Sequence, residues 1–353
     1  MEPAPDWIIG YIDTPIAKIP IISTALNSGD RINGRKVRLG IGRDDYKVLP
    51  GLYAVGTPDK ASPVLVTANY KLTFDSLRSE LSDLSAWIAV IDTKGINVWC
   101  AAGKGTFGTA ELAGRVTALQ LGRLVAHNML ILPQLSAPGV AAHEVFKMCG
   151  FRIAYGPVRA CDIKEFLSNG MKATTEMRRV RFGLKDRAIL TPIELMHNIK
   201  HMLLIFLVLL ALNLTLWRQP SFIIAARMAF LNYIPYLSAF LIGCIAVPVL
   251  LPWIPFRSFA LKGLLVGLIP AAFMLLYPEA FGYTSASWLI KASYMLIVPV
   301  IASFLSLNFT GSTTYTSFSG VKQEMKLALK PYVTAVALGL ILVAVDSIIR
   351  FLY

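Results

Sequence analysis

Asn97-Val98-Trp99-Cys100-Ala101-Ala102-Gly103-Lys104 is a stretch that ends a short apolar run with a single thiol. It continues directly into the glycine-rich turn Gly103-Lys104-Gly105-Thr106-Phe107-Gly108. Thiolate is a soft, strongly donating metal ligand, and glycine-rich turns between a strand and a helix bind large anionic cofactors. The stretch therefore predicts a cofactor with a metal at its centre, held by Cys100.

Strands and helices are predicted to alternate on both sides of this stretch. Apolar runs predict strands at 64–67, 87–91, 96–101, 129–132 and 151–155. Helical spacing and boundary residues predict helices at 74–84, 109–126, 138–148 and 162–170. Before about residue 60, short apolar pieces between Gly, Pro and Asp turns indicate a few short strands and loops. The alternation predicts an α/β domain with a largely parallel sheet over 1–170, with Cys100 near a carboxyl strand end, where such sheets bind ligands.

The glycine-rich turn matches two nucleotide-binding patterns only in part. It fits G-x-G-x-x-G, but a dinucleotide site also needs an acidic residue about 20 positions on. No Asp or Glu lies between Leu112 and His143, which disfavours nicotinamide and flavin cofactors. A Walker A loop is excluded because Val98 stands at the first glycine position and Gly105 follows Lys104 in place of Ser or Thr.

The other possible metal ligands are few. A lone cysteine in an apolar run is also typical of a small core residue, and this alternative stays open for Cys100. The same interpretation is favoured for the remaining cysteines, Cys149, Cys161 and Cys244. The absence of a C-x-x-C pair from the sequence fits free thiols in a reducing compartment. His197 and His201 share one helix face, but without a third ligand nearby they favour a polar surface at a membrane interface.

The second half of the chain is apolar enough to cross a membrane. Hydrophobic residues make up 55% of the chain, and much of the net charge of +13 lies just before the first long apolar run. Segments of about 20 apolar residues can span a bilayer. Five such segments predict an all-α transmembrane domain over 201–353: 202–217, 236–256, 260–277, 286–307 and 332–351. The piece 221–234 is expected to lie at the interface or to extend the second span.

Charged and polar residues around these segments predict their orientation. A basic linker is expected over 171–200, with Thr191 as the cap that opens a helix. The Lys-rich and Lys-poor loops alternate as five spans require, which places the N-terminal domain in the cytoplasm and the helices in the inner membrane. Met1 to Trp7 has no basic segment of the kind that begins a signal peptide. The basic residues are not interleaved with aromatic residues, so nucleic acid is not an expected partner.

The stretch Asn97–Lys104 resembles, without departure, the signature of the membrane-bound corrinoid protein of mercury methylation. That family is related to the corrinoid iron–sulfur protein of the acetyl-CoA pathway. Three further stretches also resemble it: Gln134–Val140, Tyr155–Ala160 and Asn308–Ser317. The resemblance implies a Rossmann-like corrinoid-binding domain followed by about five membrane helices.

The resemblance also implies a site. Cys100 would be the catalytic residue and the lower axial ligand of cobalt in a base-off, cobalamin-type corrinoid. The other residues implied to contact the cofactor are Asn97, Val98, Trp99, Ala101, Ala102, Gly103, Lys104, Gly105 and Thr106. The small residues among them would let the backbone approach the broad corrin face.

The implied reaction is methyl transfer from methylcobalt(III) to Hg(II). Because Hg(II) is an electrophile, the methyl group must leave with electron density, and a thiolate opposite it donates that density to cobalt. The sequence has no cysteine set for an iron–sulfur cluster, so the resemblance implies a ferredoxin-like electron donor with two 4Fe–4S clusters. It further implies a methyl donor protein of the methyl-folate pathway, with Hg(II) arriving as a thiol complex.

Two other functions stay open at this point. One is a membrane corrinoid methyltransferase that serves another acceptor in carbon or metalloid metabolism. The other is a transporter or receptor with a cytoplasmic regulatory domain, which Asp346 within the last apolar segment would suit if it faced the bundle interior. A polar residue near a helix end is the alternative interpretation of Asp346.

Overall fold

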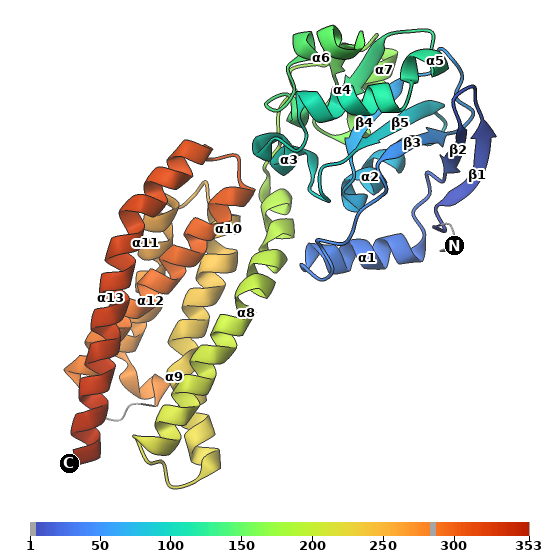
Figure 1. The fold of residues 1–353 in the computed structure, drawn as a ribbon. Helices are drawn as coiled ribbons and strands as arrows, with labels where there is room; N and C mark the ends of the chain where they lie inside the picture. Colours follow the sequence, from blue (N-terminus) through green and yellow to red (C-terminus); the bar gives the residue numbers. More distant parts are fainter. Residues whose placement is uncertain (1–4, 283–286, 353) are drawn as a thin grey trace. The chain divides into compact units, whose positions relative to one another are not determined.

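A computed structural model of the chain describes residues 5–282 and 287–352, which form two compact units, Met1–Val180 and Arg181–Tyr353 (Figure 1). Each unit has hydrophobic cores of its own. Residues 184–200, the second half of the basic segment expected as a linker, lie in the first helix of the second unit.

The first unit is built on a seven-stranded mixed sheet in the order β1-β2-β3-β5-β4-β6-β7. The strands are β1 Ile8–Asp13, β2 Lys18–Ile22, β3 Gly51–Val55, β4 Val64–Ala68, β5 Ala86–Ile91, β6 Met129–Leu132 and β7 Arg152–Tyr155. The expectation of a largely parallel sheet holds for β4 to β7, which all pair in parallel. In the other half β2 and β3 also pair in parallel, but β1 is antiparallel to β2 and β3 is antiparallel to β5, so the expectation is wrong for these two pairings.

Helices cover both faces of this sheet. They are α1 Ser28–Arg38, α2 Lys71–Arg78, α3 Val98–Lys104, α4 Thr109–Ala118, α5 Leu121–Leu124, α6 Ala142–Cys149 and α7 Ile163–Ser168, with the 3-10 turns η1 Gln134–Ser136 and η2 Ala160–Asp162. Strand β5 is buried along its whole length and sends alternate side chains to opposite faces. Trp87 packs with the core under α3 to α6, and Ile88 packs with the core under α2 and α7. The unit is therefore a three-layer α/β/α domain.

The largest correction concerns 96–101, which was expected to be a strand. Val98–Lys104 is helix α3, because the Asn97 side chain accepts a hydrogen bond from the Cys100 N–H at 3.0 Å and caps the first turn. The glycine-rich turn consequently joins two helices, α3 and α4, instead of a strand and a helix. The expected helix 109–126 is also divided, since Gln120 adopts a left-handed conformation with φ 49° between α4 and α5.

Smaller corrections concern helix boundaries. The helix expected at 74–84 is Lys71–Arg78, and the one expected at 138–148 begins only at Ala142. Asp162 stands at the start of α7 but makes no side-chain cap bond. The prediction for Thr191 is wrong, because α8 already begins at Leu184, where Asp186 accepts from the Gly183 N–H.

The second unit is helical. Its elements are α8 Leu184–Thr215, α9 Phe222–Leu241, the π-helical turn η3 Ile242–Ala246, α10 Val247–Leu250, α11 Phe259–Leu276, η4 Pro278–Phe281, α12 Trp288–Asn308, η5 Phe309–Ser312 and α13 Phe318–Leu352. Figure 1 shows the long helices running alongside one another. By length and composition, five helices in the described part of the chain could cross a membrane: Leu184–Thr215, Phe222–Leu250, Phe259–Leu276, Trp288–Gly311 and Ser319–Leu352. Each coincides with one predicted segment, although residue 286 lies outside the described residues.

Two polar features of this unit answer earlier alternatives. The piece 221–234 extends the second apolar helix, since it forms the first part of α9. Asp346 is buried, forms an ion pair with Arg350 at 2.6 Å and accepts a hydrogen bond from Ser287. Asp346 therefore faces the interior of the unit and has its charge compensated there.

Glycines allow two segments, α11 and η3, to approach α12 closely. A Cβ at Gly263 would lie 2.6 Å from the Ala302 carbonyl oxygen, and one at Gly267 would lie 2.7 Å from the Ala302 Cβ. A Cβ at Gly243, in the π-helical turn, would lie 2.6 Å from the Leu305 Cβ. Close approach at small residues is the usual way in which apolar helices pack where lipid removes the hydrophobic driving force.

Candidate functional site

The carboxyl ends of the parallel strands define the ligand-binding edge of the first unit. The chain passes from β4 through α2 to β5 on one side, whereas β6 pairs with the other side of β4. The strand order thus reverses between β4 and β6, and open α/β sheets bind ligands at such a switch point. The residues that follow these two strands are Asn69 and Tyr70 after β4, and Pro133 and Gln134 after β6.

Asn69 fixes the loop that leads from β5 to α3. Its Oδ1 accepts from the Thr93 N–H at 3.1 Å and from the Gly95 N–H at 2.9 Å. The Thr93 hydroxyl in turn donates to the Ile96 carbonyl oxygen at 2.7 Å. These bonds set the position of Asn97, and with it the start of α3. Sequence analysis did not identify Asn69, although a polar residue directly after a buried parallel strand is a usable signal.

Helix α3 has a buried face and an open face, and this divides the predicted site residues. Val98, Ala101 and Ala102 point into the hydrophobic core. The remaining predicted residues lie partly or fully in solvent: Asn97, Trp99, Cys100, Gly103, Lys104, Gly105 and Thr106. Cys100 is half-buried. The buried residues position the helix, and the open face is the part able to meet a ligand.

Close backbone packing holds the rear of α3. Gly105 ends the helix in a left-handed conformation with φ 81°. A Cβ at Gly139 would lie 2.3 Å from the Phe107 carbonyl oxygen and 3.0 Å from the Ala102 Cα, so only glycine fits there. A Cβ at Gly103 would meet nothing within 4 Å. The side of the helix at Ala102 is therefore packed tightly against Gly139, whereas no atoms occupy the space beside Gly103.

An unpaired polar atom lies beside this helix. The 3-10 turn η1, which begins at Gln134, contacts α3. The Gln134 Oε1 atom is buried and has no hydrogen-bond partner among the described residues, and the same is true of the Tyr70 hydroxyl. Buried acceptors without a partner are rare in folded proteins because they lose their hydration. Both residues follow strands of the switch point, which is where a ligand would supply the missing bonds.

The chemistry of the donor set limits what kind of metal could bind. Among residues 5–282 and 287–352, no three His, Cys, Asp or Glu side chains gather closely enough to hold a metal ion. Protein sites for free metal ions usually supply three or four ligands. A metal at Cys100 would thus have to bring most of its own ligands, as a metal in a macrocycle does. The lone thiol, the open face at Gly103 and the unpaired Gln134 oxygen together fit such a group.

Charged residues at the same edge are paired with one another. The Asp92 N–H donates to Glu111 Oε1 at 3.0 Å, and Glu111 also pairs with Arg115 at 2.9 Å. Lys94 donates to the Asp92 carboxylate, which holds the pKa of Asp92 below its usual range. These pairs brace the β5–α3 loop and leave Cys100 without a charged partner among the described residues.

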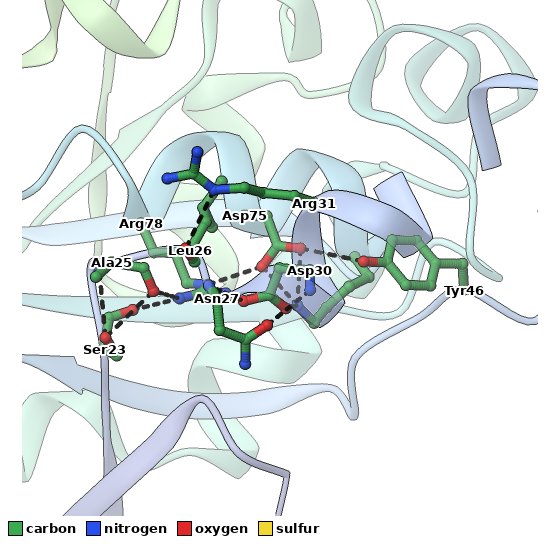
Figure 2. Close-up of polar contacts among 10 residues, drawn as sticks. Ser23, Ala25, Leu26, Asn27, Asp30, Arg31, Tyr46, Asp75 and Arg78 are labelled. Atoms are coloured by element: carbon green, nitrogen blue, oxygen red, sulfur yellow. Dashed lines mark hydrogen bonds and ion pairs between the residues drawn. The ribbon is translucent and has the colours of Figure 1, made fainter. Parts of the chain in front are cut away.

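A second polar cluster lies between α1 and α2, and its charges are all compensated (Figure 2). Asp30 lies 2.8 Å from Lys71 and 2.6 Å from Arg78, and Asp75 lies 2.6 and 2.7 Å from the same two cations. Arg78 also donates to the carbonyl oxygens of residues 23 and 25, and the Tyr46 hydroxyl donates to Asp75. We call these five residues, Tyr46, Asp30, Lys71, Asp75 and Arg78, the ion network.

The remaining cysteines, with His197 and His201, lie on elements other than α3. Cys149 packs partly against the core and Cys244 is buried, as predicted, but Cys161 is exposed, so the expectation that it is a core residue is wrong. His197 and His201 lie on α8 in the second unit.

Comparisons with known proteins concern the part of the chain that carries this site. Residues 42–167 match the family model of the CO dehydrogenase/acetyl-CoA synthase delta subunit. The gamma subunit of the acetyl-CoA decarbonylase/synthase complex of Methanopyrus kandleri is 32% identical over 127 residues, which are 35% of this chain and 27% of the relative. The gamma 1 subunit of Methanosarcina thermophila is 38% identical over 99 residues, which are 27% of this chain and 21% of the relative. The chain thus spans less than a third of the length of these relatives, and its first unit is related to proteins of the acetyl-CoA pathway.

Proposed function

We propose that this chain is a membrane-bound, corrinoid-dependent methyltransferase that transfers a methyl group to Hg(II). The relation of residues 42–167 to acetyl-CoA pathway subunits supports methyl-transfer chemistry on a corrinoid, and the sequence around Cys100 supports mercury as the acceptor. One observation carries the proposal. A half-buried thiol lies on the open face of a rigidly held helix, beside an unpaired buried acceptor at the switch point.

The residues that would hold the cofactor follow from the two faces of α3. Cys100 Sγ would bind cobalt as the lower axial ligand of a base-off corrinoid, and Trp99, Gly103 and Lys104 would lie under the ring. Gln134 Oε1 would accept from one of the amide groups at the ring edge. When bound, the corrinoid would supply a cobalt centre able to carry a methyl group.

The chain's own contribution is to fix the thiolate and to donate electron density. Helix α3 is held in place by the Asn97 cap, the buried Val98 and the close packing at Gly139. The backbone that carries Cys100 is therefore fixed. Axial-ligand identity is a main lever by which a protein tunes a cofactor's metal. A thiolate donates more strongly than water or imidazole, which favours release of the methyl group with its electron pair to an electrophile such as Hg(II).

The partners follow from what the sequence lacks. With four cysteines spread along the chain, it cannot hold an iron–sulfur cluster with the usual four thiolates. We therefore propose a ferredoxin-like donor with two 4Fe–4S clusters, a methyl donor protein of the methyl-folate pathway, and a thiol complex of Hg(II) as substrate. The five apolar helices would cross the inner membrane, with the first unit in the cytoplasm.

One observation favours a second acceptor. The family model of the CO dehydrogenase/acetyl-CoA synthase delta subunit matches residues 42–167, which include Cys100, so a carbon acceptor in that chemistry is the alternative.

The test separates cofactor binding from acceptor choice. Purified full-length protein is reconstituted with cobalamin, and its visible spectrum is compared with that of Cys100→Ala and of the control Cys161→Ala, which removes an exposed thiol. We expect thiolate ligation only where Cys100 is present. The methyl-loaded protein is then given a thiol complex of Hg(II) or a carbon acceptor. Absence of a bound corrinoid would overturn the proposal, and methyl transfer to the carbon acceptor alone would overturn mercury.

A further inference from the structure

A groove of about 770 Å³ runs along the second unit between α8, α12 and α13. Its walls are apolar over most of their length, with Ile205 on α8, Ile301 on α12 and Leu340 on α13. Its polar residues are Asn198 and His201 in the middle of α8, Asn308 at the end of α12, and Tyr332. The groove therefore has an apolar body and a polar end, which is the shape of an amphipathic ligand.

Two lysines on α13 continue the polar end. Lys330 precedes the groove residue Val333 by three positions, and Lys326 precedes Leu329 by three, so both lie next to lining residues although neither lines the groove itself. Both lysines are exposed, and neither forms an ion pair within the described part of the chain. Their charge is thus available at the mouth of the groove.

Acidic side chains at this end do not cancel that charge. Glu324, on the same helix, points elsewhere: its Oε1 accepts from Ser258 Oγ at 2.5 Å and from the Ala260 N–H at 2.6 Å. Glu194 lies one turn before Asn198 on α8 and does not line the groove. Two lysines therefore lie beside the polar end, which His201 lines.

We propose that this groove binds an anionic phospholipid. The proposal rests on the membrane location proposed above. An acyl chain would lie along Ile205, Ile301 and Leu340, and the phosphate would accept hydrogen bonds from Lys326, Lys330 and the side chains of His201 and Asn308. Basic pockets between membrane helices on the cytoplasmic side recognise anionic head groups in this way. In the proposed topology the start of α8, the end of α12 and the start of α13 all lie on that side.

The experiment measures lipid retention and selectivity on the full-length protein. The protein is reconstituted into nanodiscs of phosphatidylcholine with a minor fraction of phosphatidylglycerol, and the phospholipids that survive release into detergent are quantified by native mass spectrometry. We expect retained phosphatidylglycerol in excess of its share of the bilayer. The double variant Lys326→Gln/Lys330→Gln should reduce that preference by about fivefold per lysine. Arg257→Gln, which removes one exposed positive charge from the loop before α11, should leave the preference unchanged.

A second variant acts on the apolar body. Ala337→Trp fills the groove from α13 without changing charge, and retention of either lipid should then fall. Wild-type selectivity in the double lysine variant or wild-type retention in Ala337→Trp would overturn the proposal, as would equal retention of the two lipids by the unaltered protein. If the chain were recovered outside the membrane fraction of cells, the membrane location would fail as well. If it were in the membrane without lipid preference, the groove inference alone would fail.

Discussion

The ion network between α1 and α2 and the edge around α3 are two polar regions of the same domain that differ in one respect. In the ion network, each carboxylate meets two cations, and the remaining guanidinium protons of Arg78 reach carbonyl oxygens. At the α3 edge, the buried Gln134 oxygen has no hydrogen-bond partner among the described residues. A region whose polar groups are all paired is built for folding, whereas one with buried groups left open is built to receive a ligand.

The largest effect we expect is on the open region. Cys100→Ala should reduce methylmercury formation below detection. It should leave the fold unchanged, because removing the sulfur atom of a half-buried residue leaves only a small cavity. Cys100→His should retain a ligand of weaker donation and give an intermediate rate. Methylmercury formation is measured in cells given Hg(II), and hydrogen exchange of α3 reports the fold. Normal methylation by Cys100→Ala would remove the axial-ligand role.

The second largest effect should be on the stability of the fold, which Cys100→Ala leaves unchanged. Arg78→Met leaves Asp30 and Asp75 short of one cation in a buried site, and breaking a buried ion pair costs about 3–5 kcal/mol. We expect hydrogen exchange of 28–38 and 71–78 to accelerate strongly. Arg31→Met, which removes an exposed arginine from α1, should cost about 0.5 kcal/mol or less. Equal exchange in the two variants would mean that the network does not stabilise the domain.

Gln134→Leu should have smaller effects, which differ in direction between the stability of the protein and its affinity for the corrinoid. Because the Gln134 oxygen lacks a partner, its replacement by an apolar side chain should leave the cofactor-free protein equally or more stable. Corrinoid affinity should fall by about fivefold to tenfold, the value of one hydrogen bond of about 1 kcal/mol. Thermal unfolding and a spectral titration with cobalamin measure the two quantities. Loss of stability with unchanged corrinoid affinity would show that Gln134 stabilises the fold, as the ion network does, and does not bind the cofactor.

The smallest effect concerns pH. Burial raises the pKa of Asp30, but the hydrogen bonds and charges of Lys71 and Arg78 lower it more, so the pKa lies below the ordinary value of 3.8. A carboxyl with a depressed folded pKa stabilises the fold fully above its unfolded pKa and loses that contribution as pH falls through the folded pKa. Urea midpoints should therefore change little through this group from pH 7 to about 4 and fall below that. Asp30→Asn should weaken the acid dependence, and an unchanged dependence would contradict the assignment.

Much of the first unit could be predicted from its sequence because buried parallel strands are continuous apolar runs. β4, β5 and β6 were predicted nearly to the residue for this reason. Helix α1 was missed, since it is largely polar and begins at an Asn27–Asp30 capping box that was not considered. Helix α3 was taken for a strand because Val98 and Trp99 favour strands, whereas the Asn97 cap decides the local structure. One side-chain hydrogen bond there outweighs the strand propensity of these two residues.

The candidate site was accessible from sequence only in part. Cys100 and its neighbours were identified, but the division of α3 into a buried and an open face depends on which side of a helix meets the core, and a strand would have alternated differently. Gln134 and Asn69 lie 34 and 31 positions from Cys100 in the sequence and reach the same edge through the strand order, so no pattern around Cys100 marks them. The ion network was missed for the same reason, because Asp30 and Arg78 meet only after folding.

The glycine contacts around α12 make the packing surfaces of α11 and α12 complementary to each other. Where Gly263 and Gly267 meet Ala302, the two backbones leave no room for a methyl group, so each helix is moulded on the other. A hybrid protein that takes α11 from one homologue and α12 from another would force them apart, however apolar both were. Grafts between homologues should therefore move α11 and α12 together.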